Sequence, residues 1–368
     1  MSRSPVGIVA PRPNAARFIE QTTESVLAQD YARVEYTVMD GGSSDGTLDF
    51  VSVVIVTHNP NRELLSATLH SIECQDFPIE GFEVILVDNA SSPALEAKDF
   101  AGRNFRLRLI AEPNLGLIWG RCSGIEAASG GLIVFVDDDN QIARDYLAQA
   151  VRIARKYPEI GAFGGICEAL FAAPPAKWKD GLLRYLGIRN HGSEPITSNS
   201  GNWGPWDPIG AGMVVRHEVA QRFVEFVKTN RTARRLGRAG KSMMSGEDTL
   251  MARMAWMMNY FCSYQPSLRL LHYMKPERLR LRSLARTVAG HGRSYIVLEE
   301  ILGRVPADPL WLLPIHLPAS YLSRIRAEGL RAGSIAWLWD LGRALELVAV
   351  RKRVRNRLAG ERGRVEAE

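Results

Sequence analysis

The chain has 368 residues, of which 46% are hydrophobic and 23% charged, and this composition excludes a disordered or fibrous protein. Its length predicts one large or two modest domains. The net charge of +6 belongs mainly to the end of the chain, because residues 303–368 hold twelve Lys and Arg against seven Asp and Glu. The four cysteines are dispersed without paired spacing, which favours reduced thiols in the cytosol over a zinc site or a disulfide framework.

The first fifty residues and the next fifty read as two copies of one strand–helix–strand unit. Seven positions with helical spacing recur after 46 residues, and an Asp-x-x-Ser-Ser segment recurs after 48. The matched positions are Phe18, Ile19, Thr22, Ser25, Val26, Gln29 and Asp30 with Leu64, Leu65, Thr68, Ser71, Ile72, Gln75 and Asp76, then Asp40, Ser43 and Ser44 with Asp88, Ser91 and Ser92. Pro11 and Pro13 interrupt the first copy where a strand should end. We expect the first copy to be a truncated unit that remains from a fusion. The alternatives are that it covers an edge of the sheet or binds a partner.

From Val51 onwards the pattern alternates between strands and helices and predicts an α/β fold with a mostly parallel sheet flanked by helices. The predicted strands are 51–57, 82–88, 105–111 near an edge, and 131–137. Because right-handed crossovers bring the carboxyl ends of such strands to one edge, ligands bind there. The residues that we expect to meet at this edge are Thr57, His58, Asn59, Asp88, Asn114, Gly116, Arg121, Asp137, Asp138 and Asp139.

Three consecutive carboxylates follow the buried strand in Gly130–Asn140, GGLIVFVDDDN. They would repel one another unless a cation lay among them, and Mg²⁺ or Mn²⁺ prefers such oxygen ligands together with phosphate. Asp137 and Asp139 are easier to aim together than neighbouring residues, because alternate residues of an extended segment point the same way. The alternative is a solvated acidic turn in which Asp139 or Asn140 caps a helix.

Five segments in this order resemble the family-two glycosyltransferases of the GT-A fold: VSVVIVTHN, VILVDNASS, EPNLGL with a following Arg, VFVDDDN and SGEDT. The resemblance covers about residues 51–300. It implies a GT-A (Rossmann-like) domain that transfers a hexose-type sugar, with inversion, from a nucleotide diphosphosugar whose nucleotide is UDP, GDP or dTDP. We therefore divide the chain into a truncated repeat of the nucleotide-binding half-unit (1–50), a GT-A domain (51–275) and a helical, basic extension (276–368).

The resemblance also assigns roles to the residues at the sheet edge. Asp88 would accept a hydrogen bond from the uracil or ribose, and Thr57 with Asn59 would line the nucleoside pocket that His58 shapes. Asp137 would lie near ribose and metal, and Asp139 would ligate the Mg²⁺ or Mn²⁺ ion. In related enzymes a histidine after the acidic helix completes the coordination, which here is His272; the alternative for His272 is a hydrogen-bonded core residue.

Inversion in one displacement requires a base that takes the proton of the acceptor hydroxyl. Asp248 in Ser245–Thr249 is the candidate, and Glu247 is the alternative base or an acceptor-orienting residue. The segment after them has helical character, so the plain alternative is that both acids simply favour the first turn of a helix.

Residues 167–208 form a long connection that we expect to select the acceptor. Trp203 and Trp206 offer apolar ring faces to sugars, and Gly212 permits close approach of the backbone. The alternatives are tryptophans that close the core and a glycine that permits a tight strand bend.

The end of the chain combines Trp- and Leu-bearing helical sequence with Arg clusters, and this predicts peripheral contact with an anionic membrane surface. A glycan or lipid-linked acceptor of polysaccharide or cell-envelope biosynthesis would suit that contact. No segment resembles a nucleic-acid recognition motif. Because the sequence lacks a signal peptide and a spanning segment, we expect a cytoplasmic protein at the inner face of the membrane. The alternative functions are a catalytically silent nucleotide-sugar-binding protein and a sugar nucleotidyltransferase, although the Gly-rich triphosphate loop of the latter is missing.

Overall fold

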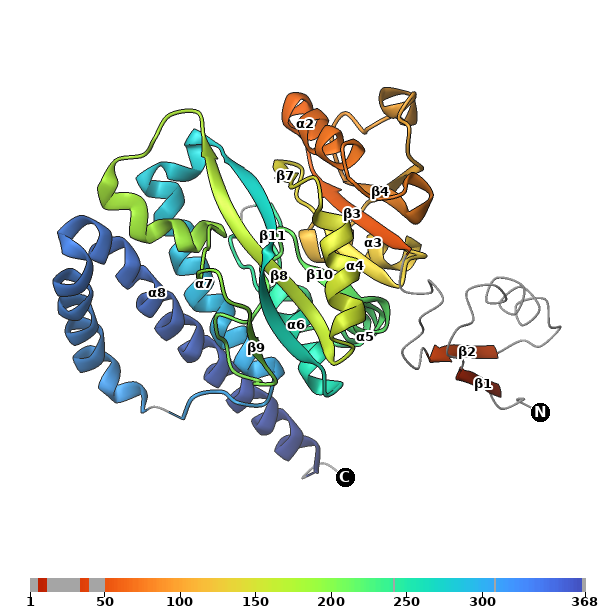
Figure 1. Ribbon diagram of the computed structural model, residues 1–368. Helices are drawn as coiled ribbons and strands as arrows, with labels where there is room; N and C mark the ends of the chain where they lie inside the picture. The colour runs from red at the N-terminus through yellow and green to blue at the C-terminus, as the bar shows by residue number, and fades with distance from the viewer. Residues whose placement is uncertain (1–5, 12–33, 40–49, 241, 308, 366–368) are drawn as a thin grey trace.

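The computed structural model describes residues 6–11, 34–39, 50–240, 242–307 and 309–365, and it shows a mixed α/β fold with a helical layer at one side (Figure 1). A nine-stranded sheet runs in the order β5-β4-β3-β6-β10-β8-β11-β7, and β9 pairs with β11. Its strands are β3 (Val51–Thr57), β4 (Phe82–Asn89), β5 (Leu107–Glu112), β6 (Leu132–Phe135), β7 (Asn140–Ile142), β8 (Ile160–Phe171), β9 (Ile196–Ser198), β10 (Val214–Arg216) and β11 (Phe261–Met274).

The sheet has a parallel half and a mixed half. The strands β5, β4, β3 and β6 are all parallel neighbours, with Thr57 opposite Asp88 in the register. The predicted strands of this half are confirmed, including the edge position of β5. In the other half β10 runs antiparallel to both β6 and β8, whereas the long strands β8 and β11 are parallel to each other.

Helices cover both faces of the sheet because alternate strand residues point to opposite sides. On β3, Val53 and Ile55 belong to one buried cluster and Val54 to the other. The first cluster contains residues of α2 (Arg62–Glu73) and α4 (Tyr146–Lys156), and the second contains residues of α3 (Leu117–Ala127), α5 (His217–Thr229) and α6 (Glu247–Met257). The parallel strands are therefore buried on both sides, as their continuous apolar runs indicate.

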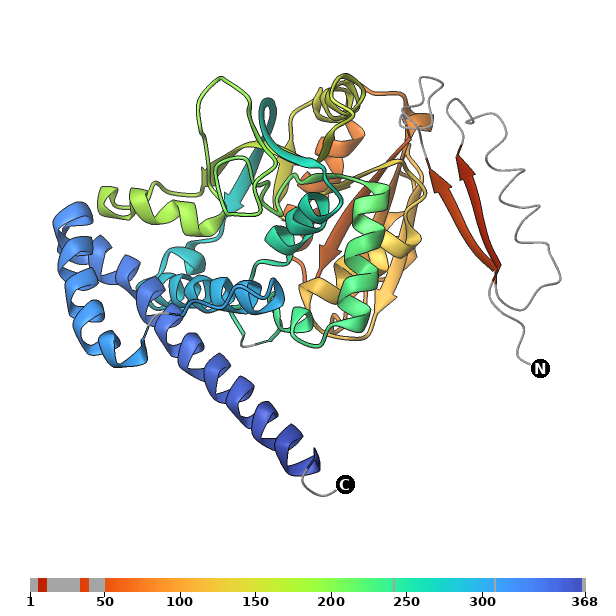
Figure 2. The same cartoon turned by 90° about the horizontal axis from the view of Figure 1, so that it is seen from below.

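The C-terminal layer consists of α7 (Leu281–Ile301) and α8 (Leu313–Val365), which pack against each other. They lie on the side of β8 and β11 away from β3–β5 (Figures 1 and 2). Gly329 interrupts α8 with φ 78° and ψ 167°, so α8 is two helices joined at a kink. A small apolar cluster that includes Ala332 and Ala336 joins the second of them to Leu182 and Leu186 of the 3₁₀ helix η3 (Lys177–Leu186).

The N-terminal segment contributes the parallel strands β1 (Val6–Pro11) and β2 (Val34–Met39), which form a sheet of their own. The helix and the Asp-x-x-Ser-Ser segment predicted for the first repeat copy lie outside the described residues. Among the described helices, none is both long and apolar enough to cross a membrane.

Candidate functional site

The carboxyl ends of β3, β4 and β5 carry the residues predicted for the nucleoside side of the site. Thr57 ends β3, and both oxygens of Asp88 at the end of β4 accept backbone N–H groups, from Ser91 at 3.1 Å and Leu95 at 2.9 Å. Asn59 accepts from the N–H of Ser92 at 2.8 Å, and its own N–H donates to Ser91 Oγ at 2.8 Å. The Asp-x-x-Ser-Ser segment is therefore a folded turn held between two strand ends.

Asn89 is the central hydrogen-bonding residue of this edge, and the sequence analysis did not single it out. It is buried; its Oδ1 accepts from the N–H of Gly116 at 2.7 Å, and its Nδ2 donates to the carbonyl of Asn114 at 2.7 Å. Its own carbonyl lies 2.8 Å from Nδ1 of His58. Asn89 thus joins three predicted residues, and its only sequence signal is its position directly after Asp88.

The three aspartates have different surroundings. Thr57 Oγ1 donates to Asp138 at 2.5 Å, and burial raises the pKa of Asp138. Asp139 is buried, and although desolvation acts in the opposite direction, the neighbouring His272 and Lys275 lower its pKa to about 2. Its two oxygens lie 3.3 Å from His272 Nε2 and 3.4 Å from Lys275 Nζ. Asp139 is therefore the aspartate whose charge the surroundings stabilise.

Asp137, Asp139 and His272 fit a divalent cation. Each offers a ligand atom, and these three atoms lie within 4.8 Å of one another. Ligand atoms across a Mg²⁺ or Mn²⁺ ion are about 4.2 Å apart, since each lies about 2.1 Å from the metal, so a small inward movement would complete the set. Two carboxylates with one imidazole is a donor set that suits Mn²⁺ as well as Mg²⁺.

Cations surround the same cluster. Arg278 Nη1 lies 2.9 Å from Nε2 of His272, and burial together with the nearby charge of Arg238 lowers the pKa of Arg278. Arg278 also experiences the charges of Asp139 and Asp137. The cluster thus combines acidic ligands with positive side chains, an arrangement that suits a metal-bound diphosphate.

The acidic pair begins α6 after Gly246, whose φ of 100° favours glycine. Glu247 is buried, and its Oε1 lies 3.3 Å from Nη1 of Arg121, an equally buried residue of α3. Burial raises the pKa of Glu247, and its Oε2 has no hydrogen-bond partner among the described residues. Asp248 is half-buried and accepts the N–H of Gly210 at 2.8 Å. Arg121, predicted to bind nucleotide sugar, therefore faces the acidic pair.

The loop with the two tryptophans is fixed to α6 by a buried ion pair that the sequence analysis missed. Arg253 donates two hydrogen bonds to Asp207, at 2.8 and 2.7 Å. Trp206 packs against the apolar cluster on the α6 side of the sheet, whereas Trp203 is 72% exposed. Gly212 has φ 73°, and a Cβ there would lie 2.6 Å from the hydroxyl of Tyr146, so packing alone requires this glycine.

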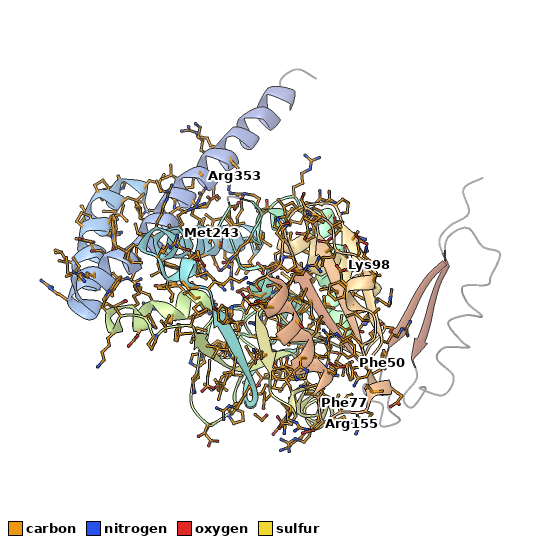
Figure 3. The ribbon with its side chains drawn as sticks, turned by 90° about the horizontal axis from the view of Figure 1, so that it is seen from above. Phe50, Phe77, Lys98, Arg155, Met243 and Arg353 are labelled. Carbon is orange, nitrogen blue, oxygen red and sulfur yellow. The ribbon has the colours of Figure 1, made fainter. Side chains whose placement is uncertain are left out.

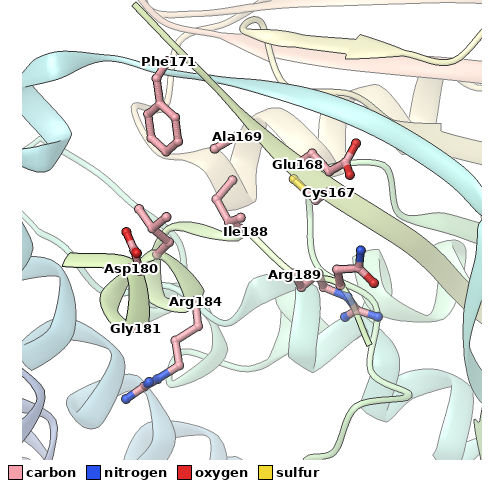
Figure 4. Close-up of a pocket in the computed structure, with 11 residues that line it drawn as sticks. Cys167, Glu168, Ala169, Phe171, Asp180, Gly181, Arg184, Ile188 and Arg189 are labelled. Atoms are coloured by element: carbon pink, nitrogen blue, oxygen red, sulfur yellow. The ribbon is translucent and has the colours of Figure 1, made fainter. Parts of the chain in front are cut away.

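A groove of about 490 Å³ lies between β8 and η3 (Figure 4). Cys167, Glu168, Arg184 and Arg189 are among the residues that line it. Burial raises the pKa of the Cys167 thiol to about 12, and the next cause is the charge of Asp137. In the register of β8 and β11, Ala169 of the groove lies opposite His272, so the groove is next to the aspartate cluster.

Comparison with known proteins agrees with this geometry. Residues 52–223 match the sequence profile of Glycosyl transferase family 2. The chain is 32% identical over 108 residues to glycosyltransferase AglE of Haloferax volcanii, covering 28% of this chain and 35% of AglE. It is 34% identical over 122 residues to an N-acetylglucosaminyltransferase of Rhizobium meliloti, covering 32% of this chain and 28% of the relative. The chain thus spans about a third of the length of these curated relatives.

Among solved structures, TarS residues 1–349 of S. aureus aligns over 80% of this chain and 92% of TarS, with a TM-score of 0.41 and 14% identity. A likeness of this size supports no statement about substrate or mechanism. The family match and the helix-covered sheet together identify the domain and its fold. Residues 52–223 form a glycosyl transferase family 2 domain, and the chain has the GT-A fold with a helical C-terminal extension.

Proposed function

We propose that the protein is an inverting glycosyltransferase that moves a sugar from a nucleotide diphosphosugar to a hydroxyl group of a glycan or lipid-linked acceptor. Asp137, Asp139 and His272 would hold Mg²⁺ or Mn²⁺, and Asp248 would be the general base. A bound ion would stabilise the negative charge that develops on the departing diphosphate.

One observation carries the proposal: the charge of one cation, Arg238, acts both on Arg278 beside the ion-binding cluster and on the acidic pair. Arg278 contacts His272 and experiences the charge of Arg238. Arg238 in turn acts on Glu247. A site that holds a diphosphate at one end and a carboxylate at the other is what a single displacement at the anomeric carbon requires.

The chain's own residues supply the remaining steps. Asp248 would take the proton as the acceptor oxygen attacks the anomeric carbon, and the bond from that carbon to the diphosphate oxygen would break with its electron pair going to the diphosphate. Lys275 and Arg278 would hold the phosphate oxygens through charge-assisted hydrogen bonds. Thr57, His58, Asn59, Asp88, Asn114 and Gly116 would form the nucleoside pocket.

Asp248 is the better candidate for the base because its carboxylate is less buried than that of Glu247 and can accept a further hydrogen bond. Glu247 is buried against Arg121, which suits a residue that orients the acidic pair. Asp248 is half-buried and accepts one backbone N–H on each oxygen, from Gly210 and from Thr249 at 2.8 Å. Oδ1 also accepts the Thr249 hydroxyl at 3.5 Å, whereas Oδ2 keeps a second lone pair for an incoming hydroxyl group.

The experiment is a thermal-shift and product-release screen of the whole chain against UDP-, GDP- and dTDP-sugars, with and without Mn²⁺ or Mg²⁺. Stabilisation by one nucleotide sugar that requires the ion, together with release of its nucleoside diphosphate, is the expected result. Binding without turnover across an acceptor panel would indicate a silent binding protein. Release of pyrophosphate from a nucleoside triphosphate would indicate a nucleotidyltransferase.

The acceptor side includes the exposed Trp203, and the groove beside Cys167 would accommodate further sugar units. Trp206 and Gly212 would shape this side from beneath, since both are packed. The groove, with Glu168 and two arginines in its lining, offers polar partners for hydroxyl groups.

We further propose that the first half of α8 binds an anionic membrane surface from the cytoplasmic side. Trp311 in the 3₁₀ helix η6 (Leu310–Leu312), and Ile315 and Leu322 in α8 directly after it, are 73%, 62% and 55% exposed. Their spacing of four and seven residues favours one face of this helical segment. The exposed Arg326 follows on the same helix, and the exposed Arg331 lies just after the kink at Gly329. An apolar stripe beside cations is the pattern of helices that lie in the membrane interface.

Co-sedimentation with vesicles of phosphatidylglycerol and phosphatidylcholine tests this contact. The wild type should bind the anionic vesicles, and a Trp311→Glu/Ile315→Glu variant should lose binding while keeping nucleotide release. Leu345→Glu is the matched control, because Leu345 is also exposed on α8 but lies outside the stripe. Equal sedimentation of all three proteins would contradict the proposal.

A further inference from the structure

Helix α7 of the C-terminal extension is packed directly onto the loop that leads into the acidic pair. A Cβ on Gly290 would lie 2.3 Å from the carbonyl oxygen of Met243, so only glycine allows this approach. Four residues later, Ser294 Oγ accepts the N–H of Ser245 at 2.9 Å. Met243 lies beside the helical layer in Figure 3. Helix α7 is thus a supporting wall of the site, although it lies beyond the residues that match the family profile.

The opposite side of the same helix turn is equally close to α8. A Cβ on Gly292 would lie 2.0 Å from the carbonyl oxygen of Trp339. Two glycines therefore hold α7 between the loop at Met243 and α8. His291, the residue between them, has its position fixed by backbone contacts on both sides.

The imidazole of His291 lies near the acidic pair, close enough for the charge of Asp248 to act on it. Its ring meets the ring of Tyr185 edge-on, with centroids 6.0 Å apart. The charges of Arg238, Asp248 and Arg278 act on it, and Asp248 is the carboxylate among them. Together with the loop contact at Met243, this places His291 on the side of the candidate base.

His291 Nε2 is buried and has no hydrogen-bond partner among the residues that the structure describes. A buried polar nitrogen without a partner is unfavourable, so such atoms are normally satisfied by a ligand or by water. Burial lowers the pKa of His291 to about 4, so the ring is neutral near pH 7 and carries one donor and one acceptor. A neutral imidazole of this kind is a suitable partner for a hydroxyl group.

We propose that His291 binds the acceptor, with Nε2 hydrogen-bonded to a sugar hydroxyl beside the one that Asp248 deprotonates. The inference rests on the proposed function and adds a specificity-determining residue from outside the family domain. Its role is to hold the acceptor hydroxyl against the base; the donor sugar and its diphosphate would contact the other end of the site.

The test compares the wild type with His291→Ala and His291→Gln, with octyl glycosides of common hexoses as acceptors and the donor found in the nucleotide-sugar screen. We expect His291→Ala to raise the acceptor KM by about tenfold or more, the loss of one hydrogen bond to a buried site. Its donor KM and its donor-dependent thermal shift should stay at wild-type values. His291→Gln, which keeps a donor and an acceptor, should recover part of the loss.

His316→Ala is the matched control, because His316 is an exposed histidine of α8. Ion-dependent stabilisation by the nucleotide sugar reports on the proposed function separately, so its absence in the wild type would remove that proposal and not only the role of His291. An unchanged acceptor KM in His291→Ala overturns the inference. An equal rise in donor and acceptor KM, or failure of the wild type to bind or glycosylate any octyl glycoside, overturns it as well.

Discussion

The backbone N–H of Gly210 donates a 2.8 Å hydrogen bond to Oδ2 of Asp248. The loop with the two tryptophans and the candidate base are therefore one structural unit, with Asp207 of the same loop bound to Arg253 of α6. Any movement of the loop changes the direction in which the Asp248 carboxylate points.

Asp248→Asn should abolish most transfer activity without unfolding the protein. The amide oxygen of Asn can still accept the N–H of Gly210, but it cannot take a proton from the acceptor, and loss of a general base costs about 10²–10⁴-fold in kcat. Steady-state kinetics with saturating donor measures this effect. Glu225→Gln, an exposed acid of α5, should keep wild-type rates. Retained turnover in Asp248→Asn would transfer the role to Glu247, which Glu247→Gln then tests.

Asp139→Asn should weaken the response to the divalent ion. Asp139 is the buried aspartate of the cluster and contacts both His272 and Lys275. We expect the apparent Mn²⁺ affinity to fall by more than the ~10–100-fold that loss of an outer-shell partner causes. A Mn²⁺ titration of nucleoside diphosphate release after treatment with EDTA measures it. Asp145→Asn, an exposed residue six positions later, is the control, and equal titration curves for both variants would exclude the metal role.

Arg253→Ala should destabilise the fold by about 3–5 kcal/mol, because it leaves the buried carboxylate of Asp207 without its partner. Replacing both residues, as Arg253→Met with Asp207→Asn, should cost less than Arg253→Ala alone. Urea unfolding followed by tryptophan fluorescence gives these free energies. Arg222→Ala removes an exposed ion pair of α5 and should change the free energy of unfolding by less than about 1 kcal/mol. A small effect of Arg253→Ala would show that water replaces the guanidinium.

The free energy of unfolding should fall between pH 6.5 and 4 through His291. Its pKa is about 4 in the folded protein, against an ordinary value of 6.5, because of burial and the charge of Arg238; Asp248 opposes this shift and Arg278 adds to it. In this range the unfolded chain binds up to one more proton, so stability is lost as the pH falls, by at most about 1.4 kcal/mol per pH unit. The wild type should lose more stability than His291→Gln from pH 7.5 to 5. Parallel unfolding curves for the two proteins would exclude this contribution.

The parallel half of the sheet was predictable because strands buried on both faces must be apolar throughout. Residues 51–57 and 82–88 have such runs, and their ends carry the polar residues that meet at the edge. The three-residue strand β10 was not predicted, because its antiparallel place between β6 and β8 depends on neighbours distant in the sequence. The repeat in residues 1–50 stays a prediction, as do the domain boundaries.

For the site, sequence spacing indicated the groups that directly follow strands or begin helices, such as Asp139 and Asp248. Residues that act through distant contacts gave no local signal. The bonds of Asn89 to Gly116 and Asn114 depend on the β5–α3 loop. The position of His291 depends on two glycines whose importance only the packed helices reveal.

The kink in α8 has a consequence for how the protein could adapt to different surroundings. At Gly329 the backbone adopts φ 78° and ψ 167°, which side-chain-bearing residues avoid, yet a Cβ there would meet nothing within 4 Å. The part of α8 before the kink is also held against the part after it, because Arg324 pairs with Asp340 at 3.0 Å and Trp337 Nε1 donates to the carbonyl of Leu317 at 2.9 Å. A substitution at Gly329 would therefore strain this turn and act on the part of α8 that precedes it, and not on the residues of the candidate site. That helical surface and the proposed chemistry could thus change separately in evolution.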